Sequence, residues 1–390
     1  MILRWHDLIG FLWCVSKIQL REKDRELILQ FSQGGAPWES VGALAEMNGV
    51  SGLLYHHLKT LGLISILPES FTRQIENSYR KTKESTLAIV AEAKALSRIC
   101  EDAGISVVAL QGLSLLSIYG DLGLRALSDV DLMVKQGYKE SLKTLLLDSG
   151  YRAPLVAYPD LFFKDGIQLD IHTHVLNLDR IGARSYLFPE DLTRMWERAI
   201  PFSDQSDGLL LLDPYDNFIA LAAHALKHSY SRLIWLADLH EFLIKWTKNN
   251  NGWKKVIERS RFWQQDKVVL YALIFMERIF GLRPPFWVKS ELDIQQLSTF
   301  ERHLIRLKVR GFSSNELCIG LWLFNLKGAG KKMEFIKETL FPKDEVMAQI
   351  FPSDSRRARI SAYPKRIWQI LSLVMANLHR AVTISLRSRR

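Results

Sequence analysis

Two aspartates separated by one residue, Asp129 and Asp131, are the side chains of this sequence best placed to do chemistry. They stand in Ser-Asp-Val-Asp-Leu-Met-Val, residues 128–134, whose apolar positions predict a buried strand. Alternate residues of a strand face the same side about 7 Å apart, so the two carboxylates would repel unless a divalent cation lay between them. The alternative for so common a tripeptide is a strand-end turn, in which Asp129 caps and Asp131 faces water.

A glycine turn precedes this strand. A short β-branched run at residues 105–110, ISVVAL, leads into Gln111-Gly112-Leu113-Ser114. A helix starting there would offer free N–H groups and a positive dipole end to an anion. We therefore expect Gly112 to let a phosphate approach the backbone and Ser114 to add a hydroxyl, although a plain strand-to-helix turn accounts for both residues as well.

Two further charged residues extend this candidate site. Arg125 is a permanent cation suited to bidentate contact with phosphate, or alternatively to an ion pair with one of the aspartates. Asp170 interrupts an alternating apolar strand, with Gln168 and His172 on its own face. A carboxylate in the middle of such a strand is costly unless it is paired or bound to a metal, and a lysine or arginine partner is the alternative.

The elements that must position these residues form a small α/β unit. Residues 104 to about 176 predict strand, helix, strand, helix, strand and strand in that order. The second helix, residues 138–150, ends at a glycine, and Asp165-Gly166 predicts the turn of a hairpin. After a loop region, helical periodicity returns with Asp213 as N-cap and Pro214 at the first helical position.

Helical patterns flank this unit on both sides, so we expect an α+β fold with N- and C-terminal helical regions. We divide the chain into an N-terminal helical region, the α/β core, a helical domain and a basic C-terminal segment with an amphipathic helix. Their expected boundaries are residues 1–103, 104–210, 211–345 and 346–390.

Composition excludes several classes of protein. The 390 residues are 48% hydrophobic and 24% charged, which is ordinary for a globular chain and argues against disorder, collagen and coiled coil. Three dispersed cysteines are too few for a disulfide framework, so we expect a reduced, cytoplasmic compartment. The apolar stretch from Leu8 to Val15 predicts a buried first helix rather than a secretory signal, and no uncharged apolar run reaches the roughly 18 residues of a membrane span.

Positive charge is concentrated near the C-terminal end. Residues 355–390 contain nine basic residues and no acidic one, and so account for most of the net charge of +10. The rest of the chain therefore lacks the basic surface typical of nucleic-acid-binding proteins. Apolar residues at 367, 370, 371, 374, 378 and 382 predict an amphipathic helix. This helix lies on an anionic membrane surface at the inner face or against a partner, or alternatively packs on the helical domain.

The segment LQGLSLLSIYGDLGLRALSDVDLMV, residues 110–134, resembles the signature of the bacterial uncharacterised nucleotidyltransferases, in which a Lys-Gly turn, a Tyr and an Arg precede D-[IV]-D. The resemblance extends to LDIHTHV, residues 169–175, and to HALKHSYSRLIWLADLHEFL, residues 224–243. Two positions depart from the pattern: Gln111 stands where lysine is usual, and Thr173 where an aromatic residue is typical.

The resemblance implies a polymerase-β-like nucleotidyltransferase core with a small mixed sheet. It further implies transfer of a nucleoside monophosphate from an NTP to an acceptor with release of pyrophosphate, dependent on Mg²⁺ or Mn²⁺. Asp129, Asp131 and Asp170 are then the expected catalytic metal ligands. Gly112, Ser114 and Arg125 are expected to contact the nucleotide. The acceptor is left open as a small molecule, peptide, protein or RNA.

A second group of polar residues lies in the helical domain. His224 and His228 share a helix face, but no H-E-x-x-H pattern accompanies them, which argues against a metal site there. We expect His228 and Arg232 to border the cleft and contact nucleotide or acceptor. The alternative is helix packing together with an ion pair between Arg232 and Asp238, and we expect Trp235 to belong to the core.

Two other functions compete with nucleotidyl transfer. A nucleotide-sugar glycosyltransferase also uses a D-x-D motif with Mn²⁺, but this hypothesis leaves Gly112, Ser114 and Asp170 unexplained. A non-catalytic homologue that binds a nucleotide or a partner would account for Gln111 in place of lysine. The complete set of three aspartates argues against that second alternative.

Overall fold

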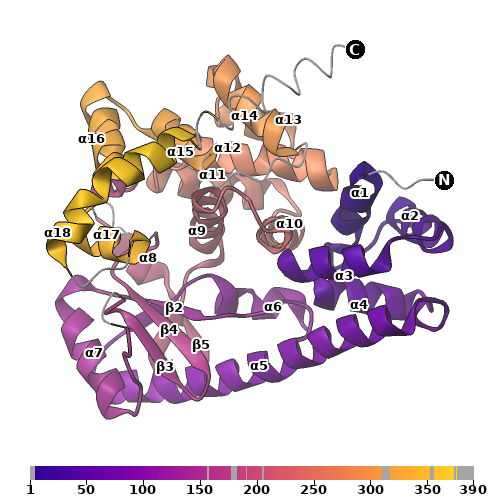
Figure 1. The fold of residues 1–390 in the computed structure, drawn as a ribbon, viewed down its shortest axis with the longest axis horizontal. Coiled ribbons are helices and arrows are strands. Elements are labelled where there is room, and N and C mark those ends of the chain that lie inside the picture. The colour runs from indigo at the N-terminus through magenta and orange to yellow at the C-terminus, as the bar shows by residue number, and fades with distance from the viewer. Residues whose placement is uncertain are drawn as a thin grey trace.

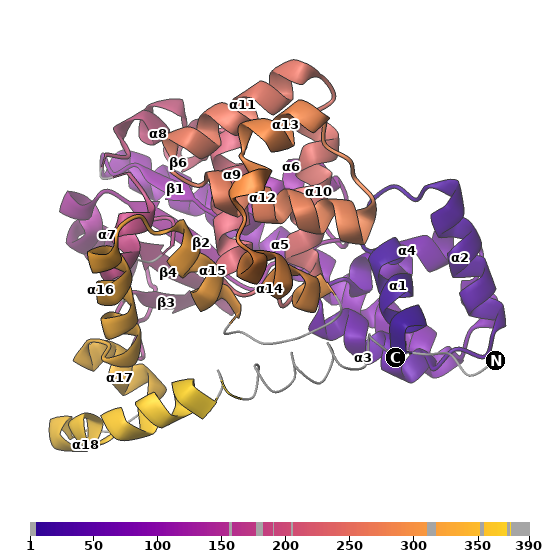
Figure 2. The same ribbon diagram turned by 90° about the horizontal axis from the view of Figure 1, so that it is seen from above.

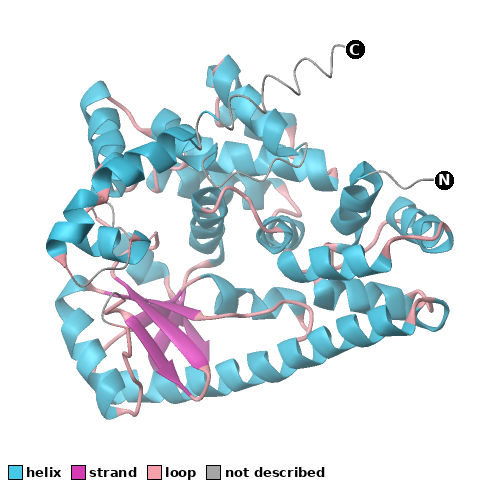
Figure 3. Cartoon of the chain, viewed as in Figure 1, coloured by secondary structure: helices cyan, strands magenta, loops and turns pink. Residues whose placement is uncertain are grey.

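The computed structural model describes residues 5–155, 158–176, 182–189, 191–203, 206–309, 317–351, 355–372 and 375. A single mixed sheet sits among many helices (Figure 3). The expected α+β fold, a small mixed-sheet core flanked by helical regions, is confirmed. No described helix is both long enough and apolar enough to cross a membrane.

The sheet contains six strands in the order β3-β4-β2-β1-β6-β5. β1 runs antiparallel to β2 and parallel to β6, and β2 runs parallel to β4. The pairs at the two edges of the sheet, β3 with β4 and β5 with β6, are antiparallel hairpins. The strands are β1 (Val107–Ala109), β2 (Val130–Val134), β3 (Leu161–Lys164), β4 (Ile167–His172), β5 (Ile200–Ser203) and β6 (Ser206–Leu211).

The strands expected within 105–110 and 129–134 are confirmed, as is the β3–β4 hairpin. Both residues of its turn, Asp165 and Gly166, have positive φ angles of 50° and 80°, which suits the twist of a two-residue hairpin. The expected loop before residue 214 was wrong in part, because β5 and β6 lie there. The apolar run of β6 does not alternate, since a strand parallel to β1 is buried on both faces.

Short helices connect the strands. Gln111 opens a 3₁₀ turn directly after β1, and the helix expected at 138–150 is confirmed as α7. These connecting elements are η2 (Gln111–Leu115), α6 (Leu116–Tyr119), η3 (Gln136–Tyr138), α7 (Lys139–Asp148), η5 (Gly182–Leu187) and α8 (Thr193–Arg198).

Five helices and one 3₁₀ turn precede the sheet. The longest, α5, runs from the N-terminal helices along the base of the molecule to the sheet (Figure 1). It contacts β6 closely: a Cβ added to Gly208 would lie 1.9 Å from the carbonyl oxygen of Ser97. These elements are α1 (Trp5–Val15), α2 (Glu22–Gln33), α3 (Trp38–Met47), α4 (Ser51–Thr60), η1 (Ile64–Ile66) and α5 (Glu69–Asp102).

Helices also follow the sheet. As expected, Asp213 caps α9, accepting a hydrogen bond from the Tyr215 N–H at 3.0 Å, and Pro214 begins the helix. Helices α16 to α18 project on the side away from α1 to α4 (Figure 2), and helical turns continue over residues 363–372. The helices are α9 (Pro214–Lys227), α10 (Leu233–Trp246), α11 (Asn250–Phe262), α12 (Asp266–Phe275), the π-helix η6 (Met276–Phe280), α13 (Phe286–Glu291), η7 (Ile294–Gln296), α14 (Thr299–Val309), α15 (Leu317–Asn325), α16 (Ala329–Leu340), α17 (Asp344–Ile350) and α18 (Arg356–Ser361).

The sheet separates two hydrophobic clusters. Val107 and Ala109 of β1 belong to the cluster formed with α5 and α7, whereas Val108 belongs to the larger cluster with α9, α10 and the N-terminal helices. Side chains of a strand alternate between its two faces, so this division shows that β1 is covered on both sides. The strands that carry the candidate site therefore have a rigid, buried frame.

Candidate active site

Asp131 and Asp170 face one another across two neighbouring strands. β2 and β4 run parallel with these two residues in direct register. His172 lies two residues beyond Asp170 on the same strand, and its Nε2 is 2.9 Å from Oδ1 of Asp131 and 3.5 Å from Oδ2 of Asp170. Within the described residues, these three form the one cluster of side chains able to enclose a metal ion, with ligand atoms within 4.8 Å of one another.

Asp129 lies directly before β2 and faces the same cleft. Its Oδ1 accepts a hydrogen bond of 2.7 Å from the Ser128 hydroxyl. Burial, and then the negative charge of Asp131, raise the pKa of Asp129 above its usual value. A carboxylate in this position is stabilised by a cation, so Asp129 and Asp131 together suit the binding of a positively charged group.

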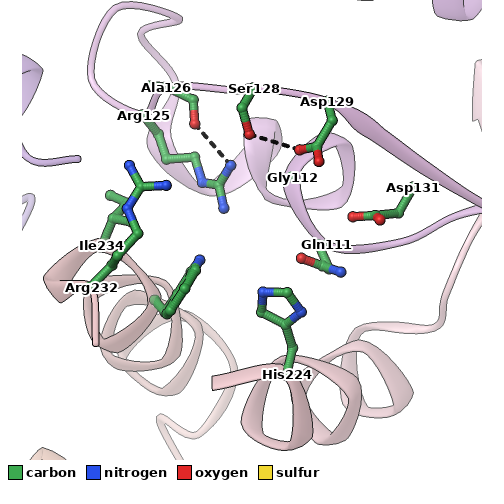
Figure 4. Close-up of a pocket in the computed structure, with 11 residues that line it drawn as sticks. Gln111, Gly112, Arg125, Ala126, Ser128, Asp129, Asp131, His224, Arg232 and Ile234 are labelled. Atoms are coloured by element: carbon green, nitrogen blue, oxygen red, sulfur yellow. Dashed lines mark hydrogen bonds between the residues drawn. The ribbon is translucent and has the colours of Figure 1, made fainter. Parts of the chain in front are cut away.

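A cleft connects these acids with α9 and α10 (Figure 4). Its acidic end carries Asp129 and Asp131, and its other end carries Arg125 and Arg232. The cleft is lined by Gln111, Gly112, Arg125, Ala126, Ser128, Asp129, Asp131, His224, Arg232, Ile234 and Trp235.

The turn after β1 forms one wall of the cleft. Gln111 has a φ of 55°, a left-handed conformation, and its side chain points into the cleft (Figure 4). Gly112 packs tightly, because an added Cβ would lie 2.6 Å from Cδ2 of Leu127 and 3.0 Å from Nη1 of Arg125, so these side chains would have to shift. Ser114 does not line the cleft: its hydroxyl donates to the Gln111 carbonyl and accepts from Nδ2 of Asn217.

Arg125 is buried and paired with Asp238 of α10. Its Nη2 donates to Oδ2 of Asp238 at 2.9 Å and its Nε to Oδ1 at 3.3 Å. The Tyr119 hydroxyl donates to the same Oδ1 at 2.8 Å. The alternative for Arg125, a structural ion pair with an aspartate, is therefore what the structure shows, with Asp238 as the partner. The expected Arg232–Asp238 pair is wrong, because within the described residues Asp238 pairs with Arg125 instead.

Within the part of the chain that the structure describes, Arg232 has no such carboxylate partner. Its Nε is buried without a hydrogen bond, and its guanidinium lies 5.8 Å from the centre of the Trp235 ring. Burial, and then the positive charge of Arg125, lower the pKa of Arg232, although the charges of Asp129 and Asp238 act in the opposite direction. An anion bound between these arginines would relieve that repulsion.

The N-terminal helices set the position of Arg232. The N–H of Leu233 donates to Oδ1 of Asn48 at 3.2 Å, and the N–H of Ile234 donates to the Asn48 carbonyl at 3.1 Å. Gly49, in the turn between α3 and α4, has a φ of 72°, a left-handed conformation that favours glycine, and a Cβ added there would lie 2.9 Å from Nη2 of Arg232. This turn thus shapes a cleft that belongs mostly to the sheet and to α10.

Histidines and Trp235 form the remaining wall. His224 lines the cleft, and burial together with His228 lowers the pKa of His224 well below its ordinary value. His228, at the C-terminal end of α9, does not line the cleft but contacts Trp235, with ring centres 5.0 Å apart. Trp235 was expected in the core, yet it is half-buried and borders the cleft.

The structure brings most of the sequence-predicted residues together. Gly112, Arg125, Asp129, Asp131 and Arg232 line one cleft, and Asp170 adjoins it through its pairing with Asp131. Sequence reasoning missed the contact of His172 with both carboxylates and the positions of Gln111, His224 and Trp235. The spacing of His172 from Asp170 carried a signal, because alternate strand residues share a face.

The fold and the cleft agree with a comparison of the chain with protein families. Residues 34–281 match the family model described as uncharacterised nucleotidyltransferase. The chain belongs to this nucleotidyltransferase family. No curated protein and no solved structure matches the chain significantly.

The segment that matches the family model contains the turn, the aspartates, His172 and the α9–α10 wall. Carboxylate oxygens and an imidazole nitrogen are ordinary ligands of divalent cations, so the residues present fit a metal ion. The assignment of Asp129, Asp131 and Asp170 as catalytic residues stays a prediction, as do the nucleotide contacts of Ser114 and His228.

Proposed function

We propose that this protein transfers a nucleoside monophosphate from an NTP to an acceptor, with a divalent cation and with release of pyrophosphate. The acceptor oxygen forms a bond to the α-phosphorus while the bond from that phosphorus to the β-phosphate oxygen breaks. The observation that carries the proposal is the register pairing of Asp131 with Asp170 at the mouth of a cleft whose opposite end is basic. Such a polarity matches a metal-bound triphosphate, which presents a cation and several phosphate oxygens together.

The carboxylates have distinct roles in this proposal. Asp129 and Asp131 hold the cation that accompanies the triphosphate, Mg²⁺ or Mn²⁺. Asp170, as a further metal ligand, helps to remove the proton of the attacking acceptor hydroxyl through the metal. A divalent cation at this position would stabilise negative charge on the triphosphate and lower the pKa of that hydroxyl. Asp131 and Asp170 are held in place by strand pairing, so little reorganisation of these two acids accompanies the reaction.

Arg232 supplies the positive charge for the phosphates. The turn residue nearest the carboxylates is Gln111, which is neutral, and Arg125 is already balanced by Asp238. Arg232 is charged, has no carboxylate partner among the described residues, and lines the same cleft. We propose that it binds oxygens of the leaving pyrophosphate, with Gly112 keeping that wall of the cleft close to Arg125.

A non-catalytic homologue and a glycosyltransferase are the competing hypotheses. The first would be expected to lose one of its acids, yet all three are present and two of them pair directly. The second needs a larger nucleotide-binding sheet than β1 and β2 provide, and it gives no role to Asp170. Both observations support nucleotidyl transfer, and the acceptor is a small molecule, peptide, protein or RNA.

A thermal unfolding experiment tests the proposal. The protein is unfolded with each of the four NTPs and with UDP-sugars, in the presence of Mg²⁺ or Mn²⁺ and in their absence. A ligand at about 100 times its Kd stabilises by roughly 2.7 kcal/mol, and we expect this shift for one NTP with metal. The shift should be lost in Asp131→Asn and retained in Asp148→Asn, because Asp148 is exposed at the end of α7.

Product analysis completes the test. We expect pyrophosphate release with the NTP that shifts the wild type when candidate acceptors are supplied, and none with Asp131→Asn. A shift with UDP-sugars alone would replace the proposal by the glycosyltransferase hypothesis. The absence of any ligand-dependent shift would favour the non-catalytic homologue.

We also propose that the C-terminal helix contacts an anionic membrane surface at the cytoplasmic face. Trp368 is 73% exposed, and Leu371 is 50% exposed on the same helical segment. Lys365 and Arg366 stand beside them in a part of the chain that contains no acidic residue. Aromatic and aliphatic side chains flanked by basic ones suit the boundary between lipid headgroups and acyl chains.

A further inference from the structure

His172 is placed to bind the metal directly. The residue is 5% exposed, and its Nδ1 is buried without a hydrogen-bond partner. The ring therefore directs Nε2 at the two carboxylates, 2.9 Å from an oxygen of Asp131 and 3.5 Å from an oxygen of Asp170. A small movement of these side chains would let one cation lie between Nε2 and the two carboxylates.

Asp129 does not belong to this cluster. The ligand atoms that lie within 4.8 Å of one another come from Asp131, Asp170 and His172, whereas Asp129 is hydrogen-bonded to Ser128. The set that can surround one cation is thus two carboxylates and one imidazole rather than three carboxylates. Asp129 is left available, with Asp131, for a cation carried in by the triphosphate.

The chemistry of these donors selects among cations. Mg²⁺ takes oxygen ligands and gives up its water molecules reluctantly, whereas imidazole nitrogen suits transition metals, and Mn²⁺ is the transition metal among those that carboxylates suit. A buried imidazole on a central strand cannot easily turn away to leave an oxygen-only site. We infer that Asp131, Asp170 and His172 form a metal site that binds Mn²⁺ in preference to Mg²⁺, an inference that assigns the resident cation of the proposed nucleotidyltransferase.

Electron paramagnetic resonance of Mn²⁺ added to the full chain, without nucleotide, tests the inference. Pulsed measurements detect the coupling of a directly bound ¹⁴N nucleus, and we expect this coupling in the wild type. It should disappear in His172→Gln and persist in His224→Gln, which removes an imidazole that lines the neighbouring cleft. Titration with Mg²⁺ as competitor should give a preference for Mn²⁺ of about tenfold or more in the wild type, falling towards equal affinity in His172→Gln.

The wild-type spectrum by itself shows whether a histidine nitrogen binds Mn²⁺, even if a variant folds poorly. Bound Mn²⁺ without ¹⁴N coupling would overturn the inference, as would equal affinity for the two cations or no binding of Mn²⁺. The result is independent of nucleotidyl transfer, because no nucleotide is present. A ¹⁴N coupling without pyrophosphate release under any condition would support the metal site and contradict the proposed function. Pyrophosphate release without ¹⁴N coupling would support the proposed function and contradict the metal site.

Discussion

At the scale of single residues, the two arginines of the cleft differ in their surroundings. Arg125 is buried against Asp238 with two hydrogen bonds, whereas Arg232 has no carboxylate partner among the contacts of the described residues. The same side-chain type therefore has a structural position in one case and a ligand-facing position in the other. Charge alone could not separate the two, because both residues stand in segments that resemble the family.

This difference predicts opposite effects of matched substitutions. Arg125→Gln leaves the buried carboxylate of Asp238 without its cation, so we expect a loss of about 3–5 kcal/mol in the free energy of unfolding. Arg232→Gln should keep the stability within about 1 kcal/mol but weaken NTP binding about tenfold or more. Urea unfolding and calorimetric titration with the NTP measure the two quantities. Equal losses of affinity in both variants, with stability unchanged, would contradict the assignment.

At the scale of elements, α4 supports the loop that carries the site. A Cβ added to Gly52 of α4 would lie 2.1 Å from the carbonyl oxygen of Gly123, in the loop that leads to Arg125. Gly123 in turn lies against the ring of Tyr79 on α5. The N-terminal helices are thus part of the frame of the cleft rather than an independent attachment.

Substitution of Gly52 tests this contact. Overpacking typically costs 1–3 kcal/mol, so we expect Gly52→Ala to destabilise the protein by roughly 2 kcal/mol and to reduce the thermal shift given by the NTP. Gly10→Ala on α1 is the control, because no atom lies within 4 Å of its added Cβ. That control should raise stability by about 0.5–1 kcal/mol through its helix propensity. Similar behaviour of the two variants would exclude the contact.

The docking of α4 on the segment after α1 depends on pH. Nε2 of His57 donates to the Lys17 carbonyl at 2.6 Å, and burial lowers the pKa of His57 from 6.5 to about 4. Between these values the unfolded chain binds a proton that the folded chain does not. Stability is therefore fully present above the ordinary histidine pKa and is lost as the pH falls from there towards 4.

This linkage can be measured by urea unfolding. The wild type should lose about 2 kcal/mol more than His57→Gln when the pH is lowered from about 7.5 to about 5, because glutamine has no proton to take up. The glutamine amide can still donate to the Lys17 carbonyl, so the comparison isolates the titration. Parallel pH profiles of the two proteins would show that His57 does not carry the effect.

At the scale of the whole molecule, basic residues are concentrated at the C-terminal end of the chain, next to two exposed apolar side chains. The segment 355–390 holds nine basic residues, while the described part of it exposes Trp368 and Leu371. The cleft lies elsewhere, between the sheet and α10. A membrane contact through this helix would therefore leave the site open to nucleotide.

Co-sedimentation with vesicles tests that arrangement. We expect binding to vesicles containing anionic lipid, weaker binding at about 0.5 M salt because the Debye length shortens, and little binding to neutral vesicles. Trp368→Ser should reduce the bound fraction, whereas Met333→Ser on α16 should not, although Met333 is 66% exposed. Equal binding of both variants, or none by the wild type, would reject the membrane contact.

The local sequence pattern was enough to predict most strands and helices around the Asp129–Asp131 motif. Alternation and β-branched residues predicted β1, β2 and the β3–β4 hairpin, and Asp213 with Pro214 predicted the start of α9. The strand β6 was not predicted, because the sequence of a buried parallel strand does not alternate between apolar and polar residues. Periodicity in a sequence shows only which faces of an element are apolar. Both faces of a buried parallel strand are apolar, so its sequence has no alternating pattern.

The sequence by itself determined which residue types were available for chemistry, because the D-x-D spacing and the later aspartate are local features. Only the tertiary structure decided which of them meet. The register of β2 with β4 brings Asp131, Asp170 and His172 together over a separation of about forty residues, and α10 gives Asp238 to Arg125 while leaving Arg232 in the cleft. Which side chains contact one another depends on packing between distant segments, and this cannot be read from residue spacing along the chain.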